Sequence, residues 1–189
     1  MTQQAETLSD AEIARIARRI DRPVALVGLM GAGKSTVGRK LAALLGTDFI
    51  DADEAIERAA QLSVSDIFEQ FGEPYFRDGE RRVIARLLEA GPSVLATGGG
   101  AFVQAPTRAL ILERGIAIWL DSDVATLVER VTRKDTRPLL RGGDPAEIVA
   151  RLMTERASSY AEAPIKVTSR TGPQGDTVNR ILQELGRWL

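Results

Sequence analysis

The sequence contains no cysteine and no histidine among its 189 residues. Without cysteine there can be no disulfide, no thiol nucleophile and no cysteine-ligated zinc or iron–sulfur site. Without histidine the chain lacks the commonest general base and the commonest metal ligand, and a Ser-His-Asp triad is impossible. Any chemistry must therefore use carboxylates, lysine, arginine, hydroxyls, backbone amides and a hard metal ion bound by oxygen.

The chain also lacks an excess of either charge. Lys and Arg total 25 against 26 Asp and Glu, a net charge of −1, which does not suggest a domain that binds nucleic acid or a membrane surface. No apolar run approaches the roughly 18 residues of a membrane span. The N-terminus carries Glu6, Asp10 and Glu12, unlike a signal or transit peptide. We expect a cytoplasmic protein that binds neither nucleic acid nor membranes.

Strand-like and helix-like segments alternate along the chain, which predicts a single α/β domain with a parallel sheet. We expect strands at 23–27, 48–51, 93–97, 115–120 and 165–169. We expect helices at 10–20, 34–45, 52–60, 65–71, 74–90, 106–113, 123–133, 145–160 and 173–188. The first of these helices begins with a Ser9–Glu12 capping box, and residues 1–22 form an extension that precedes the main domain at 23–189.

A glycine-rich segment at residues 28–35 matches the pattern G-x-x-x-x-G-K-[ST] and lies between a predicted strand and a predicted helix. Its glycines let the backbone curl so that N–H groups point inward and bind anions, and the start of the helix adds a positive dipole end. In this motif, called a P-loop, Lys34 reaches the β- and γ-phosphates and the Ser35 hydroxyl binds Mg²⁺. The chain has only four lysines, so a lysine at this position of the motif is less expected by chance.

Two carboxylates, Asp51 and Asp53, end the second predicted strand, and ligands of open α/β sheets lie beyond the carboxyl ends of the strands. One carboxylate could face Mg²⁺ through water while the other accepts the proton of an attacking hydroxyl. The alternative is an ordinary turn in which Asp53 caps the next helix.

Three arginines and a glycine turn are further candidates, each with a plainer alternative. Arg77 lies in an arginine-rich helix that could be solvated surface, and Arg156 lies near a helix end, where a cation stabilises the dipole. Arg137 lies in a polar, basic loop that we expect to be mobile; there it could close over phosphates or merely be exposed. The glycines at 98–100 expose backbone to a ligand or form a flexible loop.

Taken in order, these motifs resemble those of shikimate kinases, a family of the nucleoside-monophosphate-kinase-like P-loop fold. The resemblance covers roughly residues 23–185 and rests on GLMGAGKST, DAD, FR followed by Glu80, GGG, RPLL, and Glu155-Arg156 to Tyr160. It implies a three-layer fold with a five-stranded parallel sheet, helices on both faces, a substrate-binding region at about 52–90 and a mobile lid at about 134–146.

The resemblance also implies an activity: transfer of the γ-phosphoryl group of ATP to the 3-hydroxyl of shikimate, a step toward chorismate and the aromatic amino acids. Mg²⁺ would be bound directly by Ser35 and through water by Asp51. ATP would be held by Gly31, Ala32, Gly33, Lys34, Ser35, Thr36, Arg130 and Arg137, with a further adenine contact near 170–173. Shikimate would be held by Asp53, Arg77, Gly99 and Arg156. The catalytic residues would be Lys34, Asp53 and Arg137, in a protein that we expect to be a monomer.

Other functions are open at this point. Another small-molecule kinase of the same fold, such as a gluconate or nucleoside monophosphate kinase, would share the P-loop. A monophosphate acceptor carries about two negative charges and a base, however, and two arginines facing the Asp51/Asp53 pair suit a monocarboxylate better. A GTPase would carry N-K-x-D, but the one asparagine, Asn179, is followed by Arg180. The complete set of Lys34, Ser35 and the two aspartates argues against a P-loop protein without catalysis.

Overall fold

Five parallel strands form one sheet in the order β2-β3-β1-β4-β5. The computed structural model describes residues 7–132, 143–169 and 174–189. The strands are β1 (Val24–Val27), β2 (Phe49–Asp51), β3 (Val94–Ala96), β4 (Ile116–Asp121) and β5 (Ile165–Thr168). At the centre, Val24 of β1 is paired with Val94 on one side and with Ile116 on the other. The predicted parallel sheet is confirmed, and its strand order places the P-loop strand in the middle.

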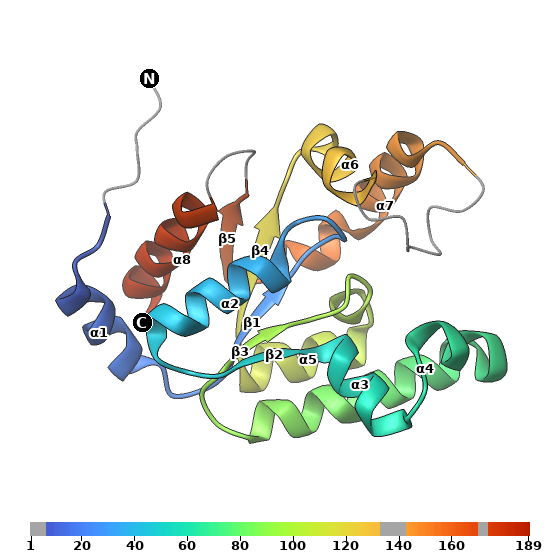
Figure 1. Ribbon diagram of the computed structural model, residues 1–189, viewed down its shortest axis with the longest axis horizontal. Coiled ribbons are helices and arrows are strands. Elements are labelled where there is room, and N and C mark those ends of the chain that lie inside the picture. The colour runs from blue at the N-terminus through green and yellow to red at the C-terminus, as the bar shows by residue number, and fades with distance from the viewer. Residues whose placement is uncertain (1–6, 133–142, 170–173) are drawn as a thin grey trace.

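Helices cover the sheet on both sides (Figure 1), which is why all four residues of β1 are fully buried. On one side α1 (Asp10–Arg19), α2 (Lys34–Leu45) and α8 (Gln174–Trp188) pack against one another, and on the other α4 (Val64–Glu89) packs against α5 (Ala105–Arg114). The remaining helices are α3 (Ala52–Ala60), the 3-10 turn η1 (Ala101–Val103), α6 (Val124–Thr132) and α7 (Pro145–Tyr160).

The N-terminal helix α1 is docked on the main body of the protein. The Ser9–Glu12 capping box forms as predicted, and Ile13 and Ile16 are buried against α2 and α8. Gly186 of α8 leaves room for this contact, because a Cβ there would lie 3.2 Å from Cδ1 of Ile16. None of the helices within the described ranges is both long and apolar enough to cross a membrane.

The predicted elements agree with the structure to within one or two residues, with two differences. The helices expected at 65–71 and 74–90 run on as one element, α4, with a kink at Gly72 (φ 80°, ψ 172°). Pro74 follows the kink and has no N–H to donate within a helix, so the break falls where the sequence placed it. The short turn η1 was not predicted.

Parallel strands bring their carboxyl ends to the same edge of the sheet, and the motifs follow those ends. The P-loop follows β1, Asp51 ends β2 with Asp53 two residues further on in α3, and the glycine turn at 98–100 follows β3. The predicted lid begins outside the described residues. Arg137 and the adenine contact predicted near 170–173 also lie outside them. The described site is therefore the part built on β1, β2 and β3, together with α4 and α7.

Candidate functional site

The P-loop has the curled backbone that its glycines predict. Gly28, Gly31 and Gly33 have φ of 137°, 82° and 91°, a range that side chains rarely adopt. Space is also short, since a Cβ on Gly28 would lie 2.6 Å from the carbonyl oxygen of Leu120. Gly33 begins α2 without a side-chain cap, and the free N–H groups of a helix start can bind an anion.

Two cations lie on the P-loop. The Lys34 ammonium donates to the carbonyl oxygens of Gly28 (2.7 Å) and Leu29 (3.0 Å), so its side chain folds over the loop. Arg130 of α6 donates to the carbonyl oxygen of Gly31 at 3.3 Å and to the hydroxyl of Ser169, after β5, at 3.2 Å. The structure thus places both residues at the loop; the contact of Arg130 with ATP stays a prediction.

Asp51 connects the P-loop to α3. The Ser35 hydroxyl donates to Oδ2 of Asp51 at 2.9 Å, while Oδ1 accepts the N–H groups of Asp53 (3.0 Å) and Glu54 (3.4 Å). Asp51 is therefore the N-cap of α3. The alternative that gave this cap to Asp53 is wrong, because Asp51 has the extended backbone of a cap whereas Asp53 already lies within the first helical turn.

The Ser35–Asp51 pair has the chemistry of a magnesium site. A hydroxyl and a carboxylate oxygen lie 2.9 Å apart beside the P-loop, and Mg²⁺ prefers oxygen ligands. Within the described ranges no group of three or more carboxylates could hold a metal alone. Mg²⁺ commonly binds through one or two protein ligands, with phosphates and water supplying the others, and the residues present fit that mode.

Asp53 lies in the first turn of α3 with its carboxylate against the glycine turn. A Cβ on Gly98 would lie 2.9 Å from Oδ1 of Asp53, so no other residue at 98 would allow this approach. One side of Asp53 is exposed, but protein on the other sides raises the pKa of its carboxyl, as does the charge of Asp51; Lys34 and Arg77 oppose the rise.

Arg77 of α4 is held by two carboxylates of its own helix. Its Nε lies 3.2 Å from Glu73, and its NH1 lies 2.8 Å from Glu80, whose side chain is only 1% exposed. Burial alone would lower the pKa of Arg77, but its bonds to Glu80 and Glu73 raise that pKa above its usual value. The guanidinium is permanently charged and fixed in place, close enough that a Cβ on Gly100 would lie 2.8 Å from its NH1.

Arg156 of α7 reaches the same glycine turn from the other side. Its NH1 donates to the carbonyl oxygen of Gly99 at 3.2 Å, and the Tyr160 hydroxyl donates to that same oxygen. Residues 7–132, 143–169 and 174–189 contain no carboxylate that pairs with Arg156. Gly99 also adjoins the P-loop, since a Cβ there would lie 3.4 Å from the backbone nitrogen of Met30. The structure therefore brings the two candidate arginines to neighbouring residues of one turn.

Sequence reasoning gave no role to Glu73 or Tyr160 and used Glu80 only as a motif letter. A signal was present in each case. Glu73 and Glu80 stand four residues before and three residues after Arg77, the spacings that bring side chains together on a helix. Tyr160 follows Arg156 by four residues and so shares its face of α7.

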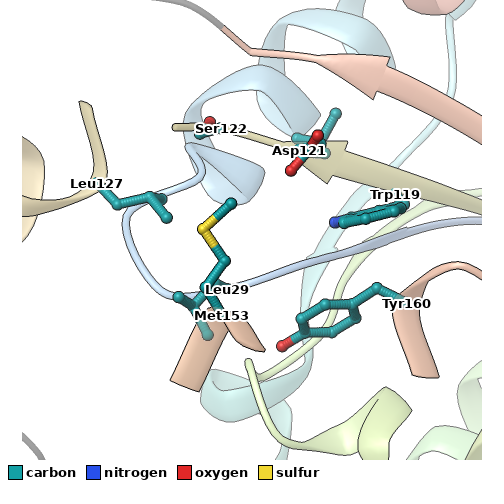
Figure 2. A pocket seen from close by; sticks show the side chains of 8 residues that line it. Leu29, Trp119, Asp121, Ser122, Leu127, Met153 and Tyr160 are labelled. Atoms are coloured by element: carbon teal, nitrogen blue, oxygen red, sulfur yellow. The ribbon is translucent and has the colours of Figure 1, made fainter. Parts of the chain in front are cut away.

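An apolar pocket lies beside this site, behind the P-loop (Figure 2). Its lining residues are Leu29, Trp119, Leu120, Asp121, Ser122, Leu127, Met153 and Tyr160. The rings of Trp119 and Tyr160 lie side by side with centroids 6.0 Å apart. Lys166 covers the outer face of Trp119, with its Nζ 4.1 Å from the ring centroid and 3.0 Å from Asp121. The ring of Tyr160 is thus held at the wall of the pocket by packing against Trp119.

The fold and the site define a class, the P-loop kinases with a five-stranded parallel sheet. Comparison with known proteins narrows it, because the family model for shikimate kinase matches residues 30–186. A shikimate kinase of Novosphingobium aromaticivorans is 61% identical over 193 residues and covers 100% of both chains. Another, of Caulobacter vibrioides, is 55% identical over 164 residues, with 87% of this chain and 82% of that protein covered. The chain belongs to the shikimate kinase family.

Solved structures agree with this assignment. The shikimate kinase of Acinetobacter baumannii has a TM-score of 0.84 at 39% identity, with 90% of this chain and 95% of that chain covered. A gluconokinase of Sinorhizobium meliloti reaches a TM-score of only 0.56 at 16% identity, with 88% of this chain and 92% of that chain covered. The second likeness is one of fold alone, so the alternative of a gluconate kinase gains no support from it.

Replacing Gly100 with alanine should disturb the acceptor site without unfolding the protein. The new Cβ would lie 2.8 Å from NH1 of Arg77, and Arg77 cannot retreat easily because Glu80 holds it. We expect the KM for shikimate to rise about tenfold, as for the loss of one charge-assisted hydrogen bond, and the KM for ATP to stay near its original value. Steady-state kinetics with each substrate varied in turn would measure both.

The matched control is Gly79→Ala on α4, the helix that carries Arg77, because a Cβ at Gly79 would meet nothing within 4 Å. We expect this variant to keep both KM values and to gain a little stability, because alanine is the better helix former. An equal rise of the shikimate KM in both variants would contradict the role given to the turn.

Proposed function

We propose that the chain transfers the γ-phosphoryl group of ATP to the 3-hydroxyl of shikimate. The observation that carries this assignment is the convergence of Arg77 and Arg156 on neighbouring residues of the turn at 98–100, beside the P-loop. Paired guanidinium groups suit a carboxylate, which accepts charge-assisted and bidentate hydrogen bonds. The relative from A. baumannii was solved in complex with shikimate, which supports the same acceptor here.

On the donor side, the N–H groups of the P-loop and the start of α2 bind the phosphates, and Lys34 leaves the loop carbonyls to contact them. Ser35 and Asp51 would hold Mg²⁺, the first directly and the second through water. When bound, Mg²⁺ neutralises charge that develops on the phosphate oxygens. Arg130 and Arg137 complete the donor site in this proposal, and Arg137 belongs to the lid predicted at about 134–146.

Asp53 orients the attacking hydroxyl and accepts its proton. The transition state of phosphoryl transfer is loose in most analyses, so the proton leaves late and alignment counts for as much as basicity. The position of Asp53 between the Asp51 carboxylate and the glycine turn suits both tasks. The raised pKa makes the proton transfer easier than it would be to an ordinary aspartate.

The region at 52–90, which contains α3 and α4, forms the shikimate side of the site in this proposal. Residues 1–22 precede the kinase domain at 23–189, and the packing of α1 on α2 and α8 supports a stabilising role for them. The monomeric state and the cytoplasmic location stay predictions.

An acceptor screen tests the proposed function directly. Release of ADP from ATP should require both Mg²⁺ and shikimate, and should not occur with gluconate or AMP as the acceptor. A coupled ADP assay measures this, and Lys34→Ala serves as the control that abolishes transfer while the fold survives. Turnover of another polyol in place of shikimate would overturn the acceptor while leaving a kinase.

The two arginines should respond differently to removal. Arg156→Ala should raise the KM for shikimate about 10- to 100-fold, as expected for a lost charge-assisted contact, and leave the melting temperature unchanged. Arg77→Ala should raise that KM and also destabilise the protein by about 3 kcal/mol, because it leaves the buried Glu80 carboxylate unpaired. Kinetics and thermal unfolding together separate the two effects.

The control is the double variant Arg77→Ala/Glu80→Gln, which removes the buried charge along with its partner. It should recover most of the melting temperature and none of the affinity for shikimate. Recovery of affinity in this variant would show that Arg77 does not bind the substrate itself.

The pH dependence should report the raised pKa of Asp53. Asp53 works as the carboxylate, so kcat/KM for shikimate should fall on acidification at a pH above about 4, the usual range of aspartate. Asp53→Asn should lower kcat by about 100-fold or more. Because a raised pKa means that the folded protein disfavours the charged form, this variant should melt at a higher temperature than the original at pH 7.

That difference in melting temperature should shrink as the pH is lowered, since the original Asp53 then becomes protonated. Glu54→Gln, one residue further along α3, is the matched control and should change neither rate nor its pH profile. If kcat/KM for shikimate fell only in the pH range of an ordinary aspartate, and Asp53→Asn did not melt at a higher temperature, burial would not raise the pKa of Asp53.

A further inference from the structure

Tyr160 is a buried hydroxyl that the proposed reaction does not use. It is the last residue of α7, its side chain is 2% exposed, and its hydroxyl donates to the carbonyl oxygen of Gly99. Arg156, one helical turn earlier, donates to that same oxygen. A carbonyl oxygen has two lone pairs, and at Gly99 both are directed to side chains of α7.

The position of this hydroxyl is set by the packing of the ring. Tyr160 lies beside Trp119 in the apolar pocket, with Met153 and Leu29 among the other lining residues (Figure 2). Burial raises the pKa of the phenol, although the charge of Arg156 opposes the rise. The hydroxyl therefore stays protonated and donates to Gly99 over the whole working pH range.

The orientation of Arg156 depends on its contact with the turn at 98–100, whereas the orientation of Arg77 is set by other partners. Two carboxylates hold Arg77, whereas within the described parts of the chain Arg156 has no carboxylate partner and donates to the Gly99 oxygen. A long, flexible arginine loses side-chain entropy when it is ordered. The direction of the Arg156 guanidinium is thus tied to where the Gly99 carbonyl points.

We propose that Tyr160 is a positioning residue: its hydroxyl fixes the Gly99 carbonyl and thereby aims Arg156 at the carboxylate of the acceptor before the acceptor binds. The inference rests on the proposed function and deepens it. A site that is already ordered loses less entropy on binding. Because the same turn adjoins the P-loop at Met30, the contact also keeps Arg156 in register with the phosphate site.

Tyr160→Phe tests the inference, because it keeps the ring and its packing and removes only the hydroxyl. We expect the KM for shikimate and the Kd from titration without nucleotide to rise about three- to tenfold, as for one lost hydrogen bond. The KM for ATP should stay within about twofold of the original value. The ratio of the shikimate KM of the variant to that of the original protein should not vary with pH. If the hydroxyl merely stabilised the fold, its removal would lower the melting temperature and would not raise the KM for shikimate more than the KM for ATP.

Ser158→Ala is the matched control, since it removes one hydroxyl from an exposed residue of the same helix α7. It should leave both KM values unchanged. An equal rise of the shikimate KM in Ser158→Ala and Tyr160→Phe would overturn the inference, as would an unchanged shikimate KM in Tyr160→Phe.

A double-variant cycle with Arg156→Lys tests whether Tyr160 acts through Arg156. If it does, the combined rise in the shikimate Kd is smaller than the product of the two single rises; a simple product rejects the inference. Failure of the proposed function itself is distinguishable, because the unaltered protein would then show no shikimate-dependent release of ADP.

Discussion

The close approach of the main chain at residues 98–100 is the constraint on which the candidate site depends. Each glycine of this turn faces a different functional side chain: Gly98 faces Asp53, Gly99 faces Arg156, and Gly100 faces Arg77. None of the three has a positive φ, so at Gly98 and Gly100 glycine is needed for space. A single methyl group at 98 or 100 would lie within 3 Å of the side chain of Asp53 or Arg77. The P-loop glycines, in contrast, are also needed for the positive φ of a curled backbone.

The turn owes its position to the sheet. β3 lies between β2 and β1, so the loop that follows it emerges between the aspartate pair on one side and the P-loop on the other. Helices α4 and α7 then bring one arginine each to this loop. Four segments that are distant in the sequence meet at three consecutive residues, and the register of the parallel strands sets how closely they approach one another.

Much of this arrangement could be predicted from the sequence, because its signals are local. The P-loop, the buried strands and the capping boxes each depend on residues within one turn or one strand. Glu73 and Glu80 likewise stand at helix spacings from Arg77, but the partner of Arg156 could not be predicted in the same way. Which of Asp51 and Asp53 caps α3 depends on the residue at which β2 ends and the helix begins. The contact of Tyr160 with Gly99 joins residues that are 61 positions apart. Contacts of that kind depend on strand order, which no local pattern encodes.

The charges of the site favour an acceptor with one negative charge. Glu73 and Glu80 set two carboxylates against the one positive charge of Arg77, so that Arg77 offers directed hydrogen bonds and adds no net positive charge to attract an anion. Within the described residues Arg156 is the arginine of this pair that has no carboxylate partner, and it supplies the net positive charge on the acceptor side.

A phosphate group in place of a carboxylate would bring about one further negative charge toward Asp53 and Glu80, and like charges repel strongly where the protein excludes water. In the proposed mechanism, Glu80, which holds Arg77, and Asp53, which would receive the proton, would therefore also disfavour a nucleoside monophosphate. On this proposal, specificity would come from repulsion as well as attraction, and part of the repulsion would come from Glu80, which also holds the Arg77 guanidinium in place.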